Sequence, residues 1–256
     1  MLWLLAFIAC AVSFLSFFSG FGLGTILTPV FAVFFPVEIA IALTAVVHLL
    51  NNVFKLFLTA GKIDRVVLLR FGIPSLAGAL AGSFLLDKLG QVHTLYIYVI
   101  DGHAFEVTVL KVIIAMLMIA FTLVELVPKW RTLQAGSNKL VAGGVLSGFF
   151  GGLSGHQGAL RSIFLVRSGM SKESFIATGI VIGCVVDLTR IPVYFSKITG
   201  TVNADGWYVI AVTTFAGFAG AFAGSRLLKK ITLDLVQRIV AVMIVLLAVA
   251  LGAGFI

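Results

Sequence analysis

Long apolar stretches alternate with short polar turns along the whole chain. A helix needs about 20 mostly apolar residues to cross the hydrocarbon core of a bilayer, whereas a spanning β-strand alternates apolar and polar positions. The continuous apolar stretches therefore predict an all-α integral membrane protein. They cover residues 3–35, 37–60, 66–86, 107–127, 140–166, 171–195, 206–228 and 233–255.

The first and fifth stretches contain dense glycine clusters. Glycine weakens a helix interior, and a cluster permits an unwound turn where that turn faces protein or a water-filled cavity. We expect a break in both stretches, with Gly20, Gly22 and Gly24 in the first and Gly151, Gly152, Gly155 and Gly158 in the second. Glycine pairs spaced four residues apart are typical of close helix packing instead. These pairs are Gly78 and Gly82, Gly144 and Gly148, and Gly220 and Gly224.

The two halves of the chain resemble each other. Residues 36–63 align without gaps to residues 171–198, with Asn52 opposite Asp187 and Lys55 opposite Arg190. In each copy a glycine-rich break precedes a short apolar segment, a charged turn and a long apolar helix. We predict two membrane repeats, at 1–127 and 139–256, joined by a basic linker at 128–138. Many secondary transporters are built from such duplicated units with broken helices.

The first repeat contains one insert that is not typical of a membrane segment. Residues 93–108 alternate apolar and polar side chains on both sides of Asp101 and Gly102. An Asp-Gly pair between two such runs is a strong signal for a two-residue turn. The insert therefore predicts a small β-hairpin outside the membrane.

Composition excludes several classes of protein. With 61% hydrophobic and 11% charged residues, the chain is too apolar for a water-soluble domain. The net charge of +8 comes from basic residues scattered between apolar stretches, so we expect no nucleic-acid partner. The sequence contains no nucleotide-binding motif, no metal-ligand cluster and no Ser/His/Asp arrangement, so we expect neither an enzyme nor a bound cofactor or metal.

The distribution of Lys and Arg favours one membrane topology. If all eight stretches crossed the membrane, the basic residues near their ends would divide seven to eight between the two sides. If the first and fifth stretches return to the side they entered, the division becomes twelve to three, the three being Lys88, Lys111 and Lys197. The positive-inside rule favours this second arrangement. It inverts the second repeat relative to the first and leaves both termini and the hairpin outside the cell.

The two breaks predict an anion-binding site. The half-helices that follow them, residues 25–35 and 159–166, would begin near the bilayer centre, where free N–H groups and positive dipole ends attract anions. Arg161 would add a full charge, although a structural or snorkelling arginine is the alternative. His156 is equally compatible with a bond to the broken backbone. The expected substrate-binding residues are Gly20, Gly22, Gly24, Thr25, Asn52, Gly155, His156, Gln157 and Arg161.

A second group of polar residues lies on the matched helices. We interpret Lys55, Asp187, Arg190 and His48 as gating or coupling residues, with Lys55 and Arg190 near opposite mouths of the pathway. Each of these residues also has a purely structural interpretation. Asp187 and Arg190 are three residues apart on one helix face, so they could form an ion pair. Lys55 could extend its amine to the membrane surface, and His48 could pack against a neighbouring helix.

These motifs together resemble the TauE/SafE family of sulfite and sulfonate exporters. The residues that carry the resemblance are 20–29, 148–161 and the Ala-Gly-rich runs at 77–83 and 219–225. The resemblance covers nearly the whole chain. It implies a carrier in a bacterial-type plasma membrane for small sulfur-containing anions such as sulfite, sulfoacetate or thiosulfate.

The leading hypothesis is a multi-pass secondary transporter of a small anion that works by alternating access. Its expected partners are the anionic substrate and the lipid bilayer, with coupling to protons or sodium ions, which the sequence does not distinguish. An anion channel, a membrane-embedded enzyme or subunit that uses His156 or Asp187, and a structural partner that docks through the hairpin are the alternatives. Its oligomeric state is not predicted.

Overall fold

The computed structural model describes residues 2–19, 23–59, 62–91, 94–126, 139–165, 168–227 and 233–256. Helices dominate these residues, and one two-stranded antiparallel sheet accompanies them. Four of the described helices are long and apolar enough to cross a membrane: Val37–Leu58, Arg65–Leu89, Glu173–Phe195 and Gly206–Arg226. The predicted all-α membrane fold is therefore confirmed.

The elements follow the predicted apolar stretches closely. The first half holds α1 (Leu2–Ser19), α2 (Leu23–Ala32), α3 (Val37–Thr59), α4 (Arg65–Val67), the π-helical turn η1 (Leu68–Gly72), α5 (Ile73–Leu89), β1 (Thr94–Ile100), β2 (His103–Thr108) and α6 (Val109–Leu126). The second half holds α8 (Leu140–Ser154), α9 (Gly158–Leu165), α10 (Lys172–Thr201), α11 (Ala204–Leu227) and α12 (Leu233–Gly252).

Both glycine-rich stretches are divided into two helices. α8 ends at Ser154, Gly155 adopts the left-handed conformation with φ +81°, and α9 begins at Gly158. Glycine is the usual residue at this position after a helix because it has no Cβ to resist positive φ. In the first stretch α1 ends at Ser19 and α2 begins at Leu23, and the expected break residues Gly20 and Gly22 lie outside the described residues. The third expected break residue, Gly24, lies within α2, so its assignment to the break was wrong.

Glycines form a close packing seam between α5 and α8. A Cβ added at Gly78 would lie 2.1 Å from the carbonyl oxygen of Val145, and one at Gly148 would lie 2.1 Å from that of Ser75. Gly152 belongs to the same seam, because a Cβ there would lie 2.2 Å from the carbonyl oxygen of Ala79. Assigning Gly151 and Gly152 to the break was therefore wrong: both lie within α8, and only residues 155–157 leave the helix.

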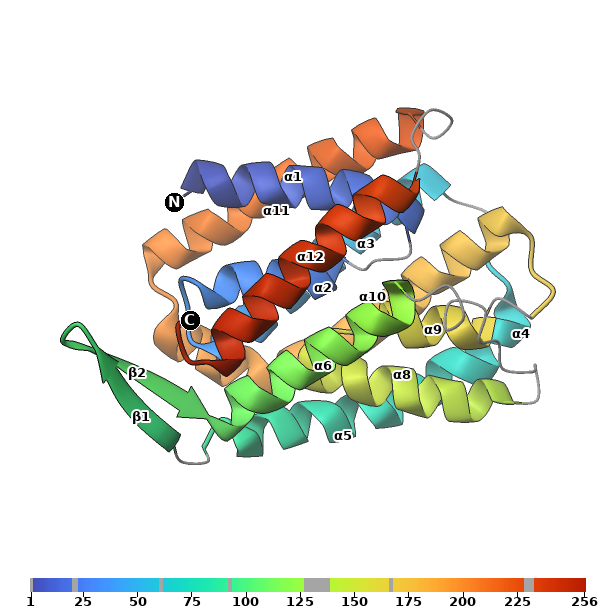
Figure 1. Cartoon of the computed structure of the whole chain (residues 1–256). Coiled ribbons are helices and arrows are strands. Elements are labelled where there is room, and N and C mark those ends of the chain that lie inside the picture. Colours follow the sequence, from blue (N-terminus) through green and yellow to red (C-terminus); the bar gives the residue numbers. More distant parts are fainter. Residues whose placement is uncertain are drawn as a thin grey trace.

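Helices from the two halves pack against each other in a reciprocal pattern. α1 of the first half lies along α11 of the second, and α8 of the second half lies along α5 of the first (Figure 1). The long helices α3 and α10 pack together, as do α6 and α12. A Cβ at Gly220 would lie 2.0 Å from the carbonyl oxygen of Cys10, so the contact between α1 and α11 is as close as the seam between α5 and α8.

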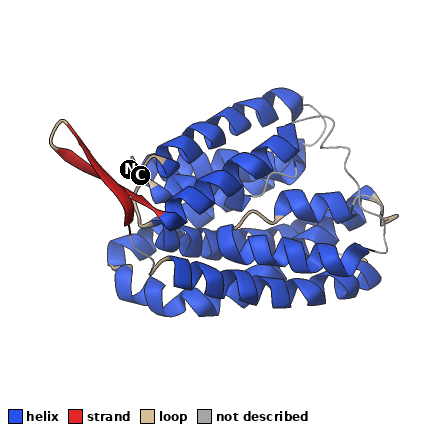
Figure 2. Ribbon diagram, turned by 60° about the horizontal axis from the view of Figure 1, so that its bottom comes forward, coloured by secondary structure: helices blue, strands red, loops and turns tan. Residues whose placement is uncertain are grey.

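The predicted hairpin projects from the helical body (Figure 2). Tyr98 lies opposite Phe105, and Asp101 and Gly102 form the turn with positive φ. The Tyr98 hydroxyl donates to the carbonyl of Ala253, and Phe105 meets Phe255 edge to face with ring centroids 5.0 Å apart. The hairpin is thereby held beside the C-terminus. Figure 1 shows it at the same end as both termini, with α4 at the opposite end.

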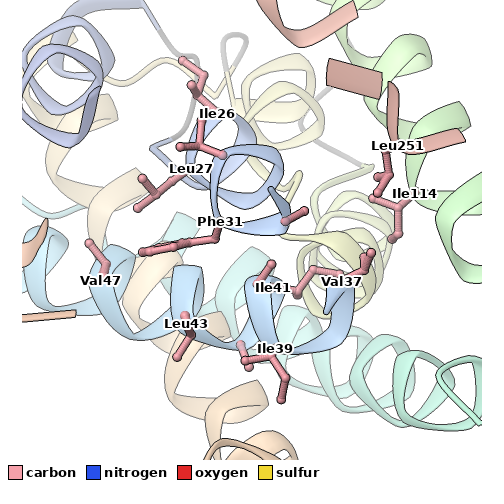
Figure 3. Close-up of a cluster of buried hydrophobic side chains, with 14 of the residues drawn as sticks. Ile26, Leu27, Phe31, Val37, Ile39, Ile41, Leu43, Val47, Ile114 and Leu251 are labelled. Carbon is pink, nitrogen blue, oxygen red and sulfur yellow. The ribbon is translucent and has the colours of Figure 1, made fainter. Parts of the chain in front are cut away.

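The short helix α2 is enclosed by protein along its whole length, since all ten of its residues are buried. Leu27 and Phe31 lie among side chains of α3, including Val47, while Ile114 of α6 and Leu251 of α12 belong to the same cluster (Figure 3). A helix end is tolerated at membrane depth only where it is buried in protein or lines a water-filled cavity. The burial of α2 in protein meets this condition.

Candidate functional site

The start of α2 meets the link between α8 and α9. A Cβ added at Gly24 would lie 3.2 Å from the carbonyl oxygen of Gly155, and one at Gly155 would lie 3.6 Å from the hydroxyl of Thr28. At 1.5 Å per residue, α2 and α9 are about 15 Å and 12 Å long, roughly half of a bilayer's hydrocarbon core or less. Two half-helices therefore begin close to one another inside the protein.

A buried ion-pair cluster lies beside this junction. Nδ1 of His48 is 2.6 Å from Oδ2 of Asp187, and the Nε and Nη2 atoms of Arg190 donate to Oδ1 of Asp187 at 3.0 and 2.8 Å. His48 comes from α3, and the other two residues come from α10. Asp187 and Arg190 are fully buried. The helical spacing suggested the pairing of Asp187 with Arg190 as the alternative to a gating role, but it did not suggest that His48 would contact the second carboxylate oxygen.

Arg190 and Tyr194 also hold the end of α8. Nη1 of Arg190 donates to the carbonyl of Gly151 at 2.9 Å, and the Tyr194 hydroxyl donates to the carbonyl of Gly152. The last turn of a helix leaves carbonyl groups without helical partners, and its partial negative charge attracts cations. Arg190 therefore lies inside the protein as a clamp on α8. Sequence reasoning missed Tyr194, although it follows Arg190 by one helical turn.

Arg161 lies in α9 over a glycine-lined face of α10. Its Nη1 atom would be 3.4 Å from a Cβ on Gly183, and its Nε atom 3.4 Å from one on Gly179. Asn52 and His48 reach the same place, since Nδ2 of Asn52 would be 2.9 Å and Cε1 of His48 3.6 Å from the Gly183 position. Nη1 of Arg161 is enclosed and has no hydrogen-bond partner among the described residues. Three predicted site residues thus converge on Gly183.

The link between α8 and α9 holds further polar atoms without partners among the described residues. Nδ1 of His156 lies 3.0 Å from the carbonyl oxygen of Ser154, which agrees with the alternative that His156 bonds to the broken backbone. Its buried Nε2 atom has no partner among the described residues. Both amide atoms of Gln157 are buried and unpartnered, and so are the hydroxyls of Thr28 and Thr44. Burying a polar group without a hydrogen bond costs about 1–3 kcal/mol. Such atoms near one junction indicate where a polar ligand would be accommodated.

Lys55 belongs to a separate polar network between α1, α3 and α11. Its Nζ donates to the hydroxyl of Ser16 at 3.0 Å, and Ser16 in turn donates to the carbonyl of Ser13. The side-chain amide of Asn51 is best oriented to accept from Ser13 and Lys55 and to donate to the carbonyl of Gly217 at 3.2 Å. Lys55 is therefore anchored inside the protein instead of snorkelling. Ser13 and Ser16 were missed because isolated serines carry no signal in an apolar helix.

The region carries an excess of positive charge. Asp187 is the one buried carboxylate among the residues whose side-chain burial is described, and His48 and Arg190 already contact both of its oxygens. Lys55 and Arg161 add two further basic side chains nearby. The remaining predicted residues, Gly24 and Thr25, are buried in the first turn of α2.

This arrangement defines an all-helical membrane protein in which two interrupted helices meet beside a buried, positively charged site. The chain matches the family described as sulfite exporter TauE/SafE over residues 5–251, nearly its full length, and it therefore belongs to that family. The family consists of membrane transporters, not enzymes. Neither the comparison with curated proteins nor the comparison with solved structures gives a match.

Proposed function

We propose that this protein is a secondary carrier of a small sulfur-containing anion in the plasma membrane, with its binding site beside Arg161, Asn52 and Gly183. The observation that carries the proposal is the enclosed Nη1 atom of Arg161, which has no hydrogen-bond partner among the described residues. A guanidinium group inside a membrane protein is costly and tends to mark a functional site.

The surroundings of Arg161 favour an anionic ligand over a protein carboxylate as its partner. Both oxygens of Asp187 are already bonded to Arg190 and His48, so it cannot form a direct ion pair with Arg161 without breaking bonds of 2.6–3.0 Å. Glycine at positions 179 and 183 leaves the α10 backbone bare beneath the guanidinium. An oxyanion with several acceptor oxygens would match the fork of donors that an arginine presents.

The start of α2 supports the same proposal. Gly24 and Thr25 form the first turn of a fully buried helix, whose free N–H groups and partial positive charge favour an anion. Thr28, on the next turn, supplies an unpartnered hydroxyl beside Gly155. His156 and Gln157 supply further unpartnered polar atoms from the opposite side. The first repeat and the second repeat would thus both contribute to one site.

Alternating access by two inverted repeats is the mechanism that we propose for this site. If every apolar stretch crossed the membrane, the hairpin would lie on the side opposite the N-terminus. If the first stretch returns, the hairpin lies on the same side as the N-terminus. Figure 1 shows the hairpin beside both termini and α4 at the other end, which supports the second topology. The reciprocal packing of α1 on α11 and of α8 on α5 is compatible with a two-fold relation between repeats.

Replacement of Arg161 tests the binding site. Arg161→Ala should weaken anion binding by about 1.5–3 kcal/mol, or roughly 10- to 150-fold, because a charge-assisted hydrogen bond is lost. Arg161→Lys should weaken it less, since the charge is kept. Binding is measured as the thermal stabilisation of purified protein by sulfite, thiosulfate and sulfoacetate, with uptake into proteoliposomes as the functional readout.

The exposed Arg65 provides the matched control, because Arg65→Ala removes a charge at the end of the helical body that carries α4. Anion binding should be unchanged in this variant. Saturable uptake that accumulates anion against its gradient would distinguish a carrier from a channel. A folded Arg161→Ala protein with wild-type affinity for all three anions would show that Arg161 is structural.

A further inference from the structure

We propose that the His48 imidazole is a proton-binding site coupled to the anion site, so that the protein carries a proton together with its anion. This inference rests on the proposed function and names its coupling ion. It is carried by the position of one ring near two charged groups. The His48 ring contacts the carboxylate of Asp187, and its Cε1 atom and the guanidinium of Arg161 both lie close to Gly183.

The geometry links the ring to the anion site directly. Cε1 of His48 and Nη1 of Arg161 lie 3.6 and 3.4 Å from one point, the position of a Cβ on Gly183, so these two atoms are at most about 7 Å apart. A small oxyanion bound to Arg161 at this place would lie beside the imidazole. The amide nitrogen of Asn52 lies 3.3 Å from both ring nitrogens and occupies the remaining side.

The other ionisable groups around His48 leave it as the natural proton acceptor. Asp187 and Arg190 of α10 are bonded to each other, and Arg161 of α9 retains its proton under all physiological conditions. Histidine is the side chain whose charge ordinarily changes between pH 5 and 8. The further ionisable residues of the neighbouring elements lie on α3 itself, α10, α1 and α11, and α2 has none. They are Glu38 and Lys55 on α3, Lys172, Glu173, Cys184, Tyr194 and Lys197 on α10, Cys10 on α1, and Asp205, Tyr208 and Arg226 on α11.

A proton on His48 would change the anion site in a defined direction. Neutral imidazole donates one N–H group, which Asp187 accepts, whereas imidazolium has a second N–H group and a positive charge. The added charge attracts the anion, and by linkage the bound anion favours the proton to the same extent. The two ligands therefore bind together. The proton enters from water with the anion on one side and returns to water with it on the other.

The cluster also connects proton binding to the helix break. Asp187 is shared between His48 and Arg190, and Arg190 donates to the carbonyl of Gly151 in the last turn of α8. A change in the charge of His48 alters the field at a carboxylate that orients this clamp. The proton site therefore lies between the long helix of the first half and the interrupted helix of the second.

Proton counting during anion binding tests the proposal. Sulfite, thiosulfate and sulfoacetate are titrated into the purified full-length protein, and calorimetry in two buffers with different ionisation enthalpies gives the protons taken up per anion. The wild type should take up more protons than His48→Gln, which retains a hydrogen-bond donor for Asp187 but has no titratable group. Anion affinity should fall from pH 6 to pH 8 by about 5- to 100-fold more in the wild type than in the variant, because one linked proton changes affinity by at most about tenfold per pH unit.

Matched outcomes separate coupling from binding. His103→Gln in the exposed hairpin should keep the wild-type proton count, since it removes a histidine far from the site. An equal count in wild type and His48→Gln would overturn proton coupling while leaving anion binding intact. If His48→Gln does not fold, the test is the affinity of the wild type for thiosulfate and sulfoacetate, measured between pH 6 and pH 8. Both anions keep their charge in this range. An affinity that does not depend on pH for either anion overturns the proposal. Failure of all three anions to bind overturns both proposals.

Discussion

Individual glycines in this protein have different roles, and the contacts around each glycine show which role it has. Gly155 provides the positive φ that ends α8, Gly82 and Gly148 allow two helices to touch, and Gly183 leaves room for polar side chains of the site. All three kinds look alike in an apolar sequence. At the residue scale, therefore, the useful experiment compares two glycines that differ only in what a methyl group would meet.

Gly183 and Gly179 form such a pair, one turn apart on α10 beneath Arg161. A methyl group at Gly183 would lie 2.9 Å from the amide nitrogen of Asn52, whereas one at Gly179 would meet only Arg161, at the ordinary contact distance of 3.4 Å. Gly183→Ala should therefore displace Asn52 and weaken anion binding by about tenfold or more, corresponding to a loss of about 1.4 kcal/mol or more. Gly179→Ala should bind normally in the same thermal-shift titration. Equal affinities in both variants would place the anion away from Gly183.

At the scale of elements, the contact between α5 and α8 has little tolerance for change. A methyl group at Gly82 would lie 2.0 Å from the carbonyl oxygen of Phe149, which is backbone and cannot move aside by a rotamer change. Gly82→Ala should therefore separate the helices and destabilise the protein by about 1–3 kcal/mol or more. Loss of the folded fraction on heating in detergent measures this effect.

Gly200 near the end of α10 is the control for that experiment, since a methyl group there would meet nothing within 4 Å. Gly200→Ala should leave the melting temperature unchanged or raise it slightly, because alanine favours helix by about 1 kcal/mol over glycine. A Gly82→Ala protein as stable as Gly200→Ala would mean that α5 and α8 separate without cost.

At the scale of the whole molecule, the hairpin and both termini share one end and α4 lies at the other (Figure 1). In the proposed orientation the end with α4 faces the cytosol. Single cysteines introduced at Lys62 and Lys139 should therefore react with an impermeant reagent only from the cytosolic side, and one at Asp101 only from outside. Cys10 and Cys184 are replaced first to give a background without thiols. Labelling of Lys62 and Asp101 positions from the same side would contradict the orientation.

The sequence determined the elements of this protein because they depend on local chemistry. Apolar length predicted the helices, Asp101 and Gly102 predicted the hairpin turn, and the glycine-rich runs predicted that two stretches would be divided. The sequence also pointed to the charged and amide residues of the candidate site, since such side chains are rare enough in apolar helices to be conspicuous, but it missed hydroxyl groups such as those of Thr28 and Tyr194. These signals arise within a few neighbouring residues and require no knowledge of the fold.

Only the tertiary structure decided how those residues are connected. His48 contacts Asp187 across 139 positions of sequence, and Tyr194 reaches the end of α8 across 42. Gly152 packs against α5 although its place in a glycine cluster predicted a break. In each case the partner comes from another helix, and the spacing of residues along one helix carries no information about which helix lies alongside. Packing between the two halves therefore determines that Asp187 pairs with His48 and Arg190, and that Nη1 of Arg161 is enclosed without a hydrogen-bond partner among the described residues.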